Sequence, residues 1–283
     1  MATIELIDSL TNAKPSYDRI AFLQQQIKNT PDMEIDLLVH IERRLGLTPL
    51  FCISTLPLLA KCFGKQIHIF CNRKSQNLFC SGGYIPAEYR NTENIDIAPL
   101  LEAKAFIVRN VNDVLSLVKE ITIDAPVKMS DELAALFTSK VGEMFNNSLE
   151  HSEGQFVIGG KYFKNQKNKY CFACYDSGVG IPQKVIQNIP HITEVEALQW
   201  AIKRGNSTTV FTKKEFVPRG LGLDMLQSFA DLNDGTIRIC SGKVLYKYNR
   251  QKRSQFFELN NRFEGTLFEM DIIADNEHRY ILK

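Results

Sequence analysis

The chain has 283 residues, of which 44% are hydrophobic and 23% charged, and its formal net charge is only +2. A chain of this length and composition can bury substantial cores and suggests two modest domains. The small net charge gives no reason to expect nucleic acid or an anionic membrane as a partner. No apolar run approaches the roughly twenty residues of a membrane span, and the N-terminus lacks a signal-peptide pattern, so we expect a cytoplasmic protein.

The first hundred residues alternate between strand and helix patterns. Residues 35–39 and 64–70 predict strands, and residues 55–63 predict a short helix for which Ser54 or Thr55 supplies an ordinary N-cap. We therefore expect a smaller α/β domain over residues 1–100, with a role in interaction or regulation. Its order is similar in pattern to the antagonist domains of bacterial partner-switching systems, but a convincing Asp-Ser phosphosite is lacking. The polar stretch from Asn91 to Ala103 predicts the boundary with a second domain, residues 101–283.

A helix is predicted from Ser130 to about His151, because apolar residues recur there at helical spacing behind a serine N-cap. Glu143 and Asn147 lie four residues apart in this run. They therefore project from one face of the helix and offer a carboxylate and an amide oxygen together.

The segment from Lys169 to Asp176 is aromatic and apolar, and it predicts a buried strand that ends at an acid. Gly178 and Gly180 follow, and glycine permits close approach of a flat or charged ligand. The Asp176 carboxylate could accept a hydrogen bond from an exocyclic amine such as that of adenine.

The seven cysteines are scattered through apolar segments, which indicates buried, reduced thiols. Cys171 and Cys174 form a C-x-x-C sequence within the predicted strand. Because residues three apart in a strand point to opposite faces, and no second pair follows, we do not expect metal or redox chemistry there.

Glycines at 220 and 222 open an apolar run that starts at Leu223 and predicts a glycine turn followed by a helix. Free amides at such a helix start favour anions such as phosphates. Farther on, the polar segment from Lys243 to Arg262 predicts a hairpin connection with a solvated basic surface, although a partner site there is left open.

Each of these motifs also has an ordinary structural explanation. A buried Asn, an Asp-Ser-Gly turn and a Gly-x-Gly helix start are common in proteins that bind no nucleotide. Their order along the chain, helix, strand with turn, then glycine turn with helix, favours a nucleotide pocket over a chance collection.

In these motifs the chain resembles the GHKL ATPase family, which includes DNA gyrase, the heat-shock chaperone, sensor histidine kinases and the mismatch-repair ATPase. The resemblance covers about Asn110 to Ile273. It implies a two-layer α/β sandwich of the GHKL type in the C-terminal domain, preceded by the smaller α/β domain. It also implies that the polar, basic stretch between Ile181 and Arg219 serves as an ATP lid, most of it from about Pro190 onward.

The resemblance implies a role for each matching residue. Glu143 would be the catalytic base, Asn147 would hold Mg²⁺, and Asp176 would read adenine, while Thr266 in the Gly265-Thr266 pair would assist through water. The ATP-binding set so implied is Asn147, Asp176, Gly178, Gly180, Lys203, Arg219, Gly220, Leu221, Gly222, Leu223 and Thr266.

From the resemblance we expect a protein that binds ATP with Mg²⁺ and either hydrolyses ATP or phosphorylates a partner protein on Ser or Thr. A nucleotide-gated interaction switch without catalysis is the alternative. His40 superficially resembles a histidine-kinase phosphoacceptor, but its neighbours are out of register and no long helical hairpin follows. We expect a protein partner or substrate, neither nucleic acid nor membrane, and we leave a homodimer open.

Overall fold

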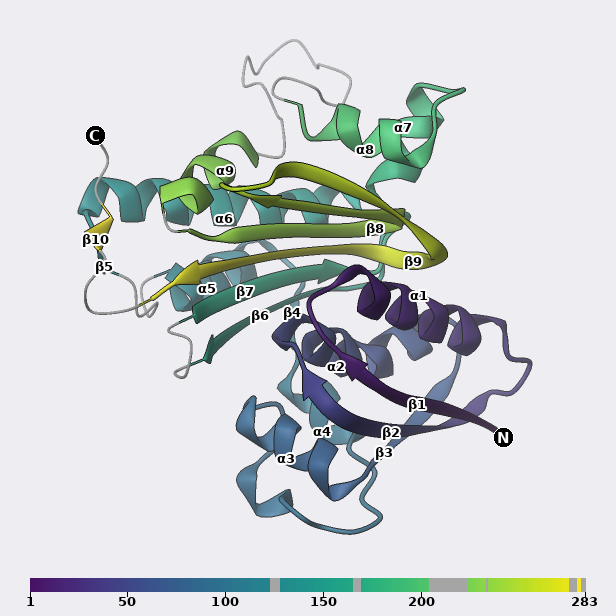
Figure 1. Cartoon of the computed structure of the whole chain (residues 1–283). Helices are drawn as coiled ribbons and strands as arrows, with labels where there is room; N and C mark the ends of the chain where they lie inside the picture. Colours follow the sequence, from purple (N-terminus) through teal and green to yellow (C-terminus); the bar gives the residue numbers. More distant parts are fainter. Residues whose placement is uncertain (123–127, 165–168, 204–222, 233, 275–278, 281–283) are drawn as a thin grey trace. The chain divides into compact units, whose positions relative to one another are not determined.

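The computed structural model describes residues 1–283 except 123–127, 165–168, 204–222, 233, 275–278 and 281–283. The chain divides into two compact units (Figure 1). Unit 1 comprises Met1–Phe106 with Leu259–Phe263, and unit 2 comprises Ile107–Glu258 with Glu264–Lys283. The sequence interpretation placed the change of domain at residue 100, inside a helix that belongs to unit 1. Both units combine helices with sheets, so the predicted mixed α/β class is confirmed.

Unit 1 is built on a three-stranded parallel sheet with the strand order β1-β2-β3. Its elements in chain order are β1 (Ala2–Leu10), α1 (Lys14–Asn29), β2 (Glu34–Leu45), α2 (Leu47–Cys62), β3 (Gln66–Cys71), α3 (Arg73–Ser81), the short 3₁₀ helix η1 (Ala87–Tyr89) and α4 (Ala98–Lys104). The strands predicted at 35–39 and 64–70 are thus present, and β2 continues well beyond the predicted end. The segment Leu259–Phe263 belongs to this unit through Asp18, whose carboxylate accepts hydrogen bonds from the backbone N–H groups of Asn260 and Asn261.

Helices α1 and α2 pack against each other on one face of this sheet (Figure 1). Both β-α-β connections step in the same direction along the sheet, and right-handed crossovers then place both helices on the same side. Burial alternates along β2 in agreement with this arrangement. The side chains on the face covered by the helices are fully buried, namely Ile35, Leu37 and Val39. Those on the opposite face are only half-buried, namely Asp36, Leu38 and His40.

Helix α2 differs from the sequence interpretation. It begins at Leu47, eight residues before the predicted start at Thr55, so the N-cap proposed for Ser54 or Thr55 is wrong. Both hydroxyls lie buried inside the helix and donate to carbonyl oxygens three residues earlier, those of Phe51 and Cys52. The described side chains of α2 from Thr48 to Ala60 are all buried, which is typical of a helix that is apolar all round.

Unit 2 contains a five-stranded sheet with the order β4-β6-β7-β9-β8 and helices packed on it. Its elements in chain order are β4 (Phe106–Val108), α5 (Val111–Thr122), β5 (Lys128–Met129), α6 (Asp131–His151), β6 (Val157–Lys164), β7 (Lys169–Asp176), α7 (Ile181–Asn188), α8 (Glu194–Ala201), α9 (Leu223–Leu232), β8 (Thr236–Asn249), β9 (Arg253–Ile273) and β10 (Arg279–Tyr280). The predicted helix from Ser130 and the predicted strand 169–176 are confirmed as α6 and β7.

Aromatic side chains hold α6 against the sheet of unit 2. The ring of Phe137 meets Phe172 of β7 edge-on, with centroids 5.7 Å apart, and stacks on Phe229 of α9 at 4.4 Å. Such pairs contribute about 0.5–1.5 kcal/mol beyond the area they bury. Helix α6 is therefore fixed relative to the end of β7, where the candidate site lies.

The segment from Lys243 to Arg262 is mostly strand rather than a loose connection. Strand β8 runs to Asn249 and β9 begins at Arg253, so the hairpin turn takes only residues 250–252. Tyr246 and Tyr248 are buried, and their hydroxyls bond to Gln227 and Asp231 of α9. The predicted hairpin is present, but several residues of the segment are buried in the core, among them Val244, Leu245 and Tyr246.

Part of the predicted lid is regular structure. Residues 194–201 form α8, which starts with a capping box between Thr193 and Glu196. Its buried Ala197 and Ala201 pack in one cluster with Val185 of α7. The remainder of the predicted lid, residues 204–219, lies outside the described residues.

Unit 2 also buries a group of charges between β7, β8 and β9. The Arg238 guanidinium contacts Glu269 at 2.6 Å and Asp271 at 2.8 Å, and Lys169 contacts Asp271 at 2.7 Å. Removal of one member of such a group leaves an uncompensated buried charge.

All seven cysteines are free thiols, and burial raises the pKa of Cys171 and Cys174. Within the described parts of the chain, no helix is long and apolar enough to cross a membrane.

Candidate functional site

The first component of the candidate site is helix α6. The Ser130 hydroxyl caps its start by accepting from the Leu133 N–H, and Phe137, Val141 and Phe145 form its buried stripe. Glu143 and Asn147 are half-buried and lie one turn apart beside that stripe.

The Glu143 carboxylate is already engaged. Its Oε2 lies 2.8 Å from the Lys140 ammonium three residues earlier, and the Glu143 side chain retains 30% of its exposure. This ion pair is partly solvated, and such pairs at helical spacing contribute only about 0.3–0.5 kcal/mol. Little free energy therefore opposes release of Glu143 to another partner.

The second component is Asp176, the last residue of β7. It is 4% exposed, and it pairs with Val157 of β6 on one side and Thr266 of β9 on the other. Its Oδ1 accepts the Gly178 N–H at 3.0 Å. The sequence prediction of an acid at a strand end is thus confirmed, and the acid is buried between two neighbouring strands.

Burial raises the pKa of the Asp176 carboxyl from its ordinary value of 3.8 to about 7. Hydrogen bonds from the Gly178 N–H, the Ser148 hydroxyl and the Thr266 N–H oppose this rise and offset it only in part. The group is therefore an acceptor held in place by three donors, and it titrates near neutral pH. Perturbed acids of this kind gather at functional sites, although structural networks also produce them.

Ser148 connects the two components, and the sequence interpretation did not include it. It follows Asn147 directly on α6, donates to Asp176, and lies 3.5 Å from the Cys174 thiol. The turn of α6 that carries Asn147 is therefore held against the end of β7. Ser148 stands directly after Asn147 in the sequence, but the partner of a serine cannot be identified from sequence.

The glycines after β7 are required by packing within the turn. A Cβ on Gly178 would lie 2.0 Å from the Ser152 carbonyl oxygen. Gly180 has a φ of +88°, and a Cβ there would lie 2.9 Å from the Ser241 hydroxyl. Both positions need glycine for reasons internal to the protein, so they do not by themselves indicate a ligand.

Gly265 and Thr266 complete the described site from β9. Gly265 has a φ of +81°, and a Cβ there would lie 1.9 Å from the Asp176 carbonyl oxygen. The Thr266 hydroxyl lies 3.0 Å from that of Ser241 of β8, which also accepts the Ile181 N–H at 2.9 Å. Ser241, also missed in the sequence, thus ties the start of α7 to the same strand end.

No described contact links the remaining predicted residues to this site. Lys203 is exposed just after α8, where its N–H bonds to the Trp200 carbonyl. Leu223 begins α9, and its side chain is not described. Four more lie outside the described residues: Arg219, Gly220, Leu221 and Gly222.

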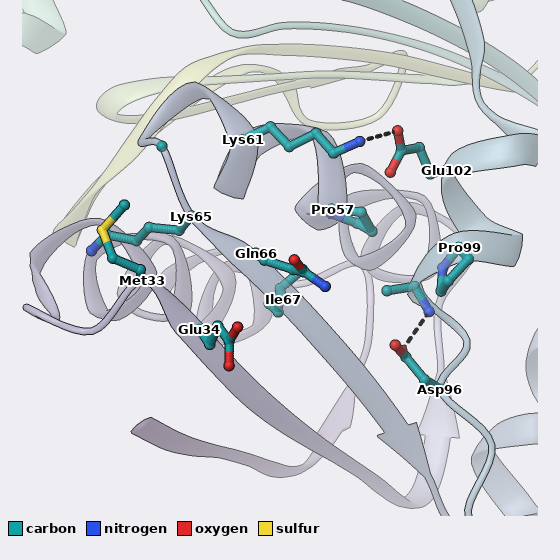
Figure 2. Close-up of a pocket in the computed structure, with 12 residues that line it drawn as sticks. Met33, Glu34, Pro57, Lys61, Lys65, Gln66, Ile67, Asp96, Pro99 and Glu102 are labelled. Carbon is teal, nitrogen blue, oxygen red and sulfur yellow. Dashed lines mark hydrogen bonds and ion pairs between the residues drawn. The ribbon is translucent and has the colours of Figure 1, made fainter. Parts of the chain in front are cut away.

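Unit 1 contains a cavity of about 600 Å³, which Figure 2 shows beside α2, β3 and α4. Its two lysines are occupied within the fold. Lys65 donates to carbonyl oxygens at the end of α1, those of Ile27 and Lys28 at 2.8 Å each, and Lys61 pairs with Glu102. These cations neutralise the protein's own groups, so the cavity is a weaker candidate for an anionic ligand than the end of β7.

Among the described residues, no group of three or more His, Cys, Asp or Glu side chains is placed to hold a metal ion. A divalent cation at the end of β7 would therefore depend on oxygen atoms of its ligand. No protein-family model matches the sequence, and no curated protein matches it either.

Proposed function

We propose that unit 2 binds ATP with Mg²⁺ in the manner of the GHKL ATPases, and either hydrolyses ATP or transfers its terminal phosphate to Ser or Thr of a partner protein. The single observation that carries the proposal is the buried Asp176 carboxylate at the end of β7, held beside the turn of α6 that bears Asn147. ATP is the ligand that the GHKL resemblance implies, and the residues at the end of β7 and on α6 are chemically compatible with it.

Adenine suits Asp176 because its exocyclic amine is a hydrogen-bond donor and the carboxylate is an acceptor. The three donors already bound to Asp176 fix the orientation of its oxygens before a ligand arrives. A charge-assisted hydrogen bond of this kind contributes about 1.5–3 kcal/mol. Thr266, whose hydroxyl lies beside Ser241, is the second polar group at this strand end.

Asn147 is the residue that fits Mg²⁺. Its amide oxygen is a hard ligand, and Asn147 is only half-buried. Mg²⁺ keeps several waters and binds through substrate phosphates with one or two protein ligands, so a single amide on α6 is sufficient. When bound, the ion would neutralise phosphate charge during transfer.

Glu143 lies one helical turn before Asn147, and we assign it the role of the base that accepts a proton from the attacking hydroxyl or water. Release from Lys140 would leave an ionised carboxylate, which is the form that accepts a proton. The partner protein, rather than this chain, would supply the Ser or Thr hydroxyl. A homodimer is compatible with this proposal but is not required by it.

The second candidate function is a nucleotide-gated switch without catalysis. It is favoured by the Lys140–Glu143 ion pair, because the Lys140 ammonium occupies Oε2 and leaves only Oε1 of this carboxylate to orient a nucleophile. In that case ATP would alter a protein surface and remain intact.

Calorimetry with ATP and Mg²⁺ tests the binding proposal, and phosphate release tests the chemistry. Wild type should bind ATP, and Asp176→Asn should weaken binding by about tenfold or more because the acceptor loses its charge. Asp131→Asn, which changes an exposed acid at the start of α6, is the matched control and should bind as wild type does. Folded wild-type protein that takes up no nucleotide would refute the proposal.

A further inference from the structure

The sheet of unit 1 has one face that its own helices leave open. Helices α1 and α2 both cover the other face, yet purely parallel sheets are almost always covered on both sides. Along β1, Thr3, Glu5 and Ile7 are exposed, and Ile7 is the most apolar of them at 45% exposure. This face of the parallel sheet, termed the open face below, lacks the layer that the architecture ordinarily carries.

The open face is apolar across its centre. Strand register places Leu38 of β2 directly between Glu5 of β1 and Phe70 of β3, and Ile7 lies two residues farther along β1. Leu38 and Phe70 are half-buried although they are central in their strands. These three side chains, Ile7, Leu38 and Phe70, form a diagonal apolar stripe that a covering element would bury.

The open face is acidic toward the start of its strands. Glu5, Glu34 and Asp36 point to this side, and among the described residues none of the three forms a salt bridge with another side chain. Glu34 and Asp36 attract the N-terminal ammonium, but that group bonds to Asp32 instead. The negative charge is therefore available to a cationic partner.

The dimensions match one helix. Three strands spaced about 4.8 Å apart give a face about 10 Å wide, and one α-helix with its side chains has a diameter of about 10–12 Å. The open-face residues of β2 run from Glu34 to His40, a length of roughly 20 Å that about 14 helical residues would span.

From these observations we infer that the open face of unit 1 binds an amphipathic helix of a partner protein, with apolar residues over Ile7, Leu38 and Phe70 and Lys or Arg toward Glu5 and Asp36. The inference is independent of nucleotide binding by unit 2. A second copy of the chain and another part of the same chain are the competing occupants. Either of these occupants would bury the apolar stripe without requiring basic residues.

The test uses the full chain and a fluorescent synthetic helix of about 16 residues, with Leu at i, i+3, i+4 and i+7 and Lys on its flanks. Fluorescence anisotropy should show saturable binding that is weakened by salt, as expected of exposed charges. A peptide of the same composition, scrambled to spread its Leu residues around the helix, should bind at least tenfold more weakly.

Two pairs of variants localise the binding. Leu38→Lys should weaken it tenfold or more, whereas Leu115→Lys, which changes a leucine 62% exposed on α5 of unit 2, should not. Asp36→Lys should weaken binding of the Lys peptide and favour a Glu-flanked version, whereas Glu258→Lys, which changes an exposed residue of β9, should do neither. A change of preference from the Lys-flanked to the Glu-flanked peptide cannot result from misfolding of the variant.

Three results would overturn the inference: no binding by wild type, equal binding by wild type and the open-face variants, or a dimer that Leu38→Lys converts to monomer. The last result would assign the open face to a second copy, and sedimentation velocity on the same samples detects it. If Leu38→Lys fails to fold, Ile7→Lys takes its place, because that side chain is already exposed.

Discussion

Replacing Asp176 with asparagine should change how the stability of the protein depends on pH. In the folded protein burial raises the pKa of Asp176 from 3.8 to about 7. The unfolded chain therefore loses this proton near pH 4, while the folded protein keeps it until about pH 7. Protonation stabilises the folded state, fully at acidic pH, and that contribution is lost as the pH rises through the folded pKa.

The magnitude follows from linkage between protonation and folding. With a folded pKa of about 7 and an unfolded value of 3.8, this one group removes about 3 kcal/mol of stability between about pH 5 and pH 8. Asparagine does not titrate, so the variant lacks this loss. Other titrating groups are common to both proteins and cancel when the two are compared at each pH.

The assay is urea unfolding of wild type and Asp176→Asn at several pH values between 5 and 8. The quantity of interest is the difference between the two free energies of unfolding. It should shift by about 3 kcal/mol in favour of the variant as the pH rises. A constant offset between the proteins is expected too, because the asparagine amide has to find its own partners, but an offset does not vary with pH.

A difference that stays constant from pH 5 to pH 8 would refute the reasoning. It would mean that Asp176 is ionised throughout this range, and hence that its hydrogen bonds outweigh its burial. Asp131→Asn serves again as control, since an exposed acid should give no such pH-dependent shift.

Four other results are expected. ATP affinity should fall as the pH drops below about 7, because adenine needs the ionised Asp176. Calorimetry at constant ionic strength measures this affinity, and an affinity independent of pH would exclude Asp176 from the binding site. Glu143→Gln should lower phosphate release by roughly a hundredfold or more with ATP binding intact, whereas equal rates would favour the switch. Gly265→Ala should destabilise by about 2 kcal/mol or more, because its Cβ would meet the Asp176 carbonyl oxygen at 1.9 Å. Gly142→Ala on α6 is the control and should stabilise slightly, because a Cβ there would meet only Val118 at an ordinary contact distance of 3.9 Å. Arg238→Met should lower the free energy of unfolding by about 3–5 kcal/mol at neutral pH. The decrease should be smaller in acid, because Arg238 holds the pKa of Asp271 low. Denaturation that shows no decrease in stability would mean that the carboxylates are solvated.

The elements that carry the candidate site could be predicted because their signals are local. Helix α6 combines a regular apolar period with a serine cap, and β7 is a short apolar run bounded by polar residues and an acid. The relation of Glu143 to Asn147 follows from helical geometry alone. The GHKL assignment of unit 2, in contrast, stays a prediction.

Other features depend on residues far apart in the chain and could not be predicted. Gly265 is required by the carbonyl of Asp176, and that contact follows from the register between β7 and β9. The start of α2 was missed for a different reason. Its residues are apolar on every side, so no helical period marks the eight residues before Thr55.

The nature of residue 176 bears on function beyond the question of binding. An asparagine at this position would present an oxygen to the same three donors without the cost of desolvating a charge, so packing alone gives no reason for an acid. At neutral pH the aspartate opposes folding, since burial raises its pKa to about 7. A ligand that donates a hydrogen bond to the carboxylate would recover that free energy on binding, as expected where stability is sacrificed for activity. The same acid therefore links the pH dependence of folding to the affinity for nucleotide, and the two should change together in any variant that alters its pKa.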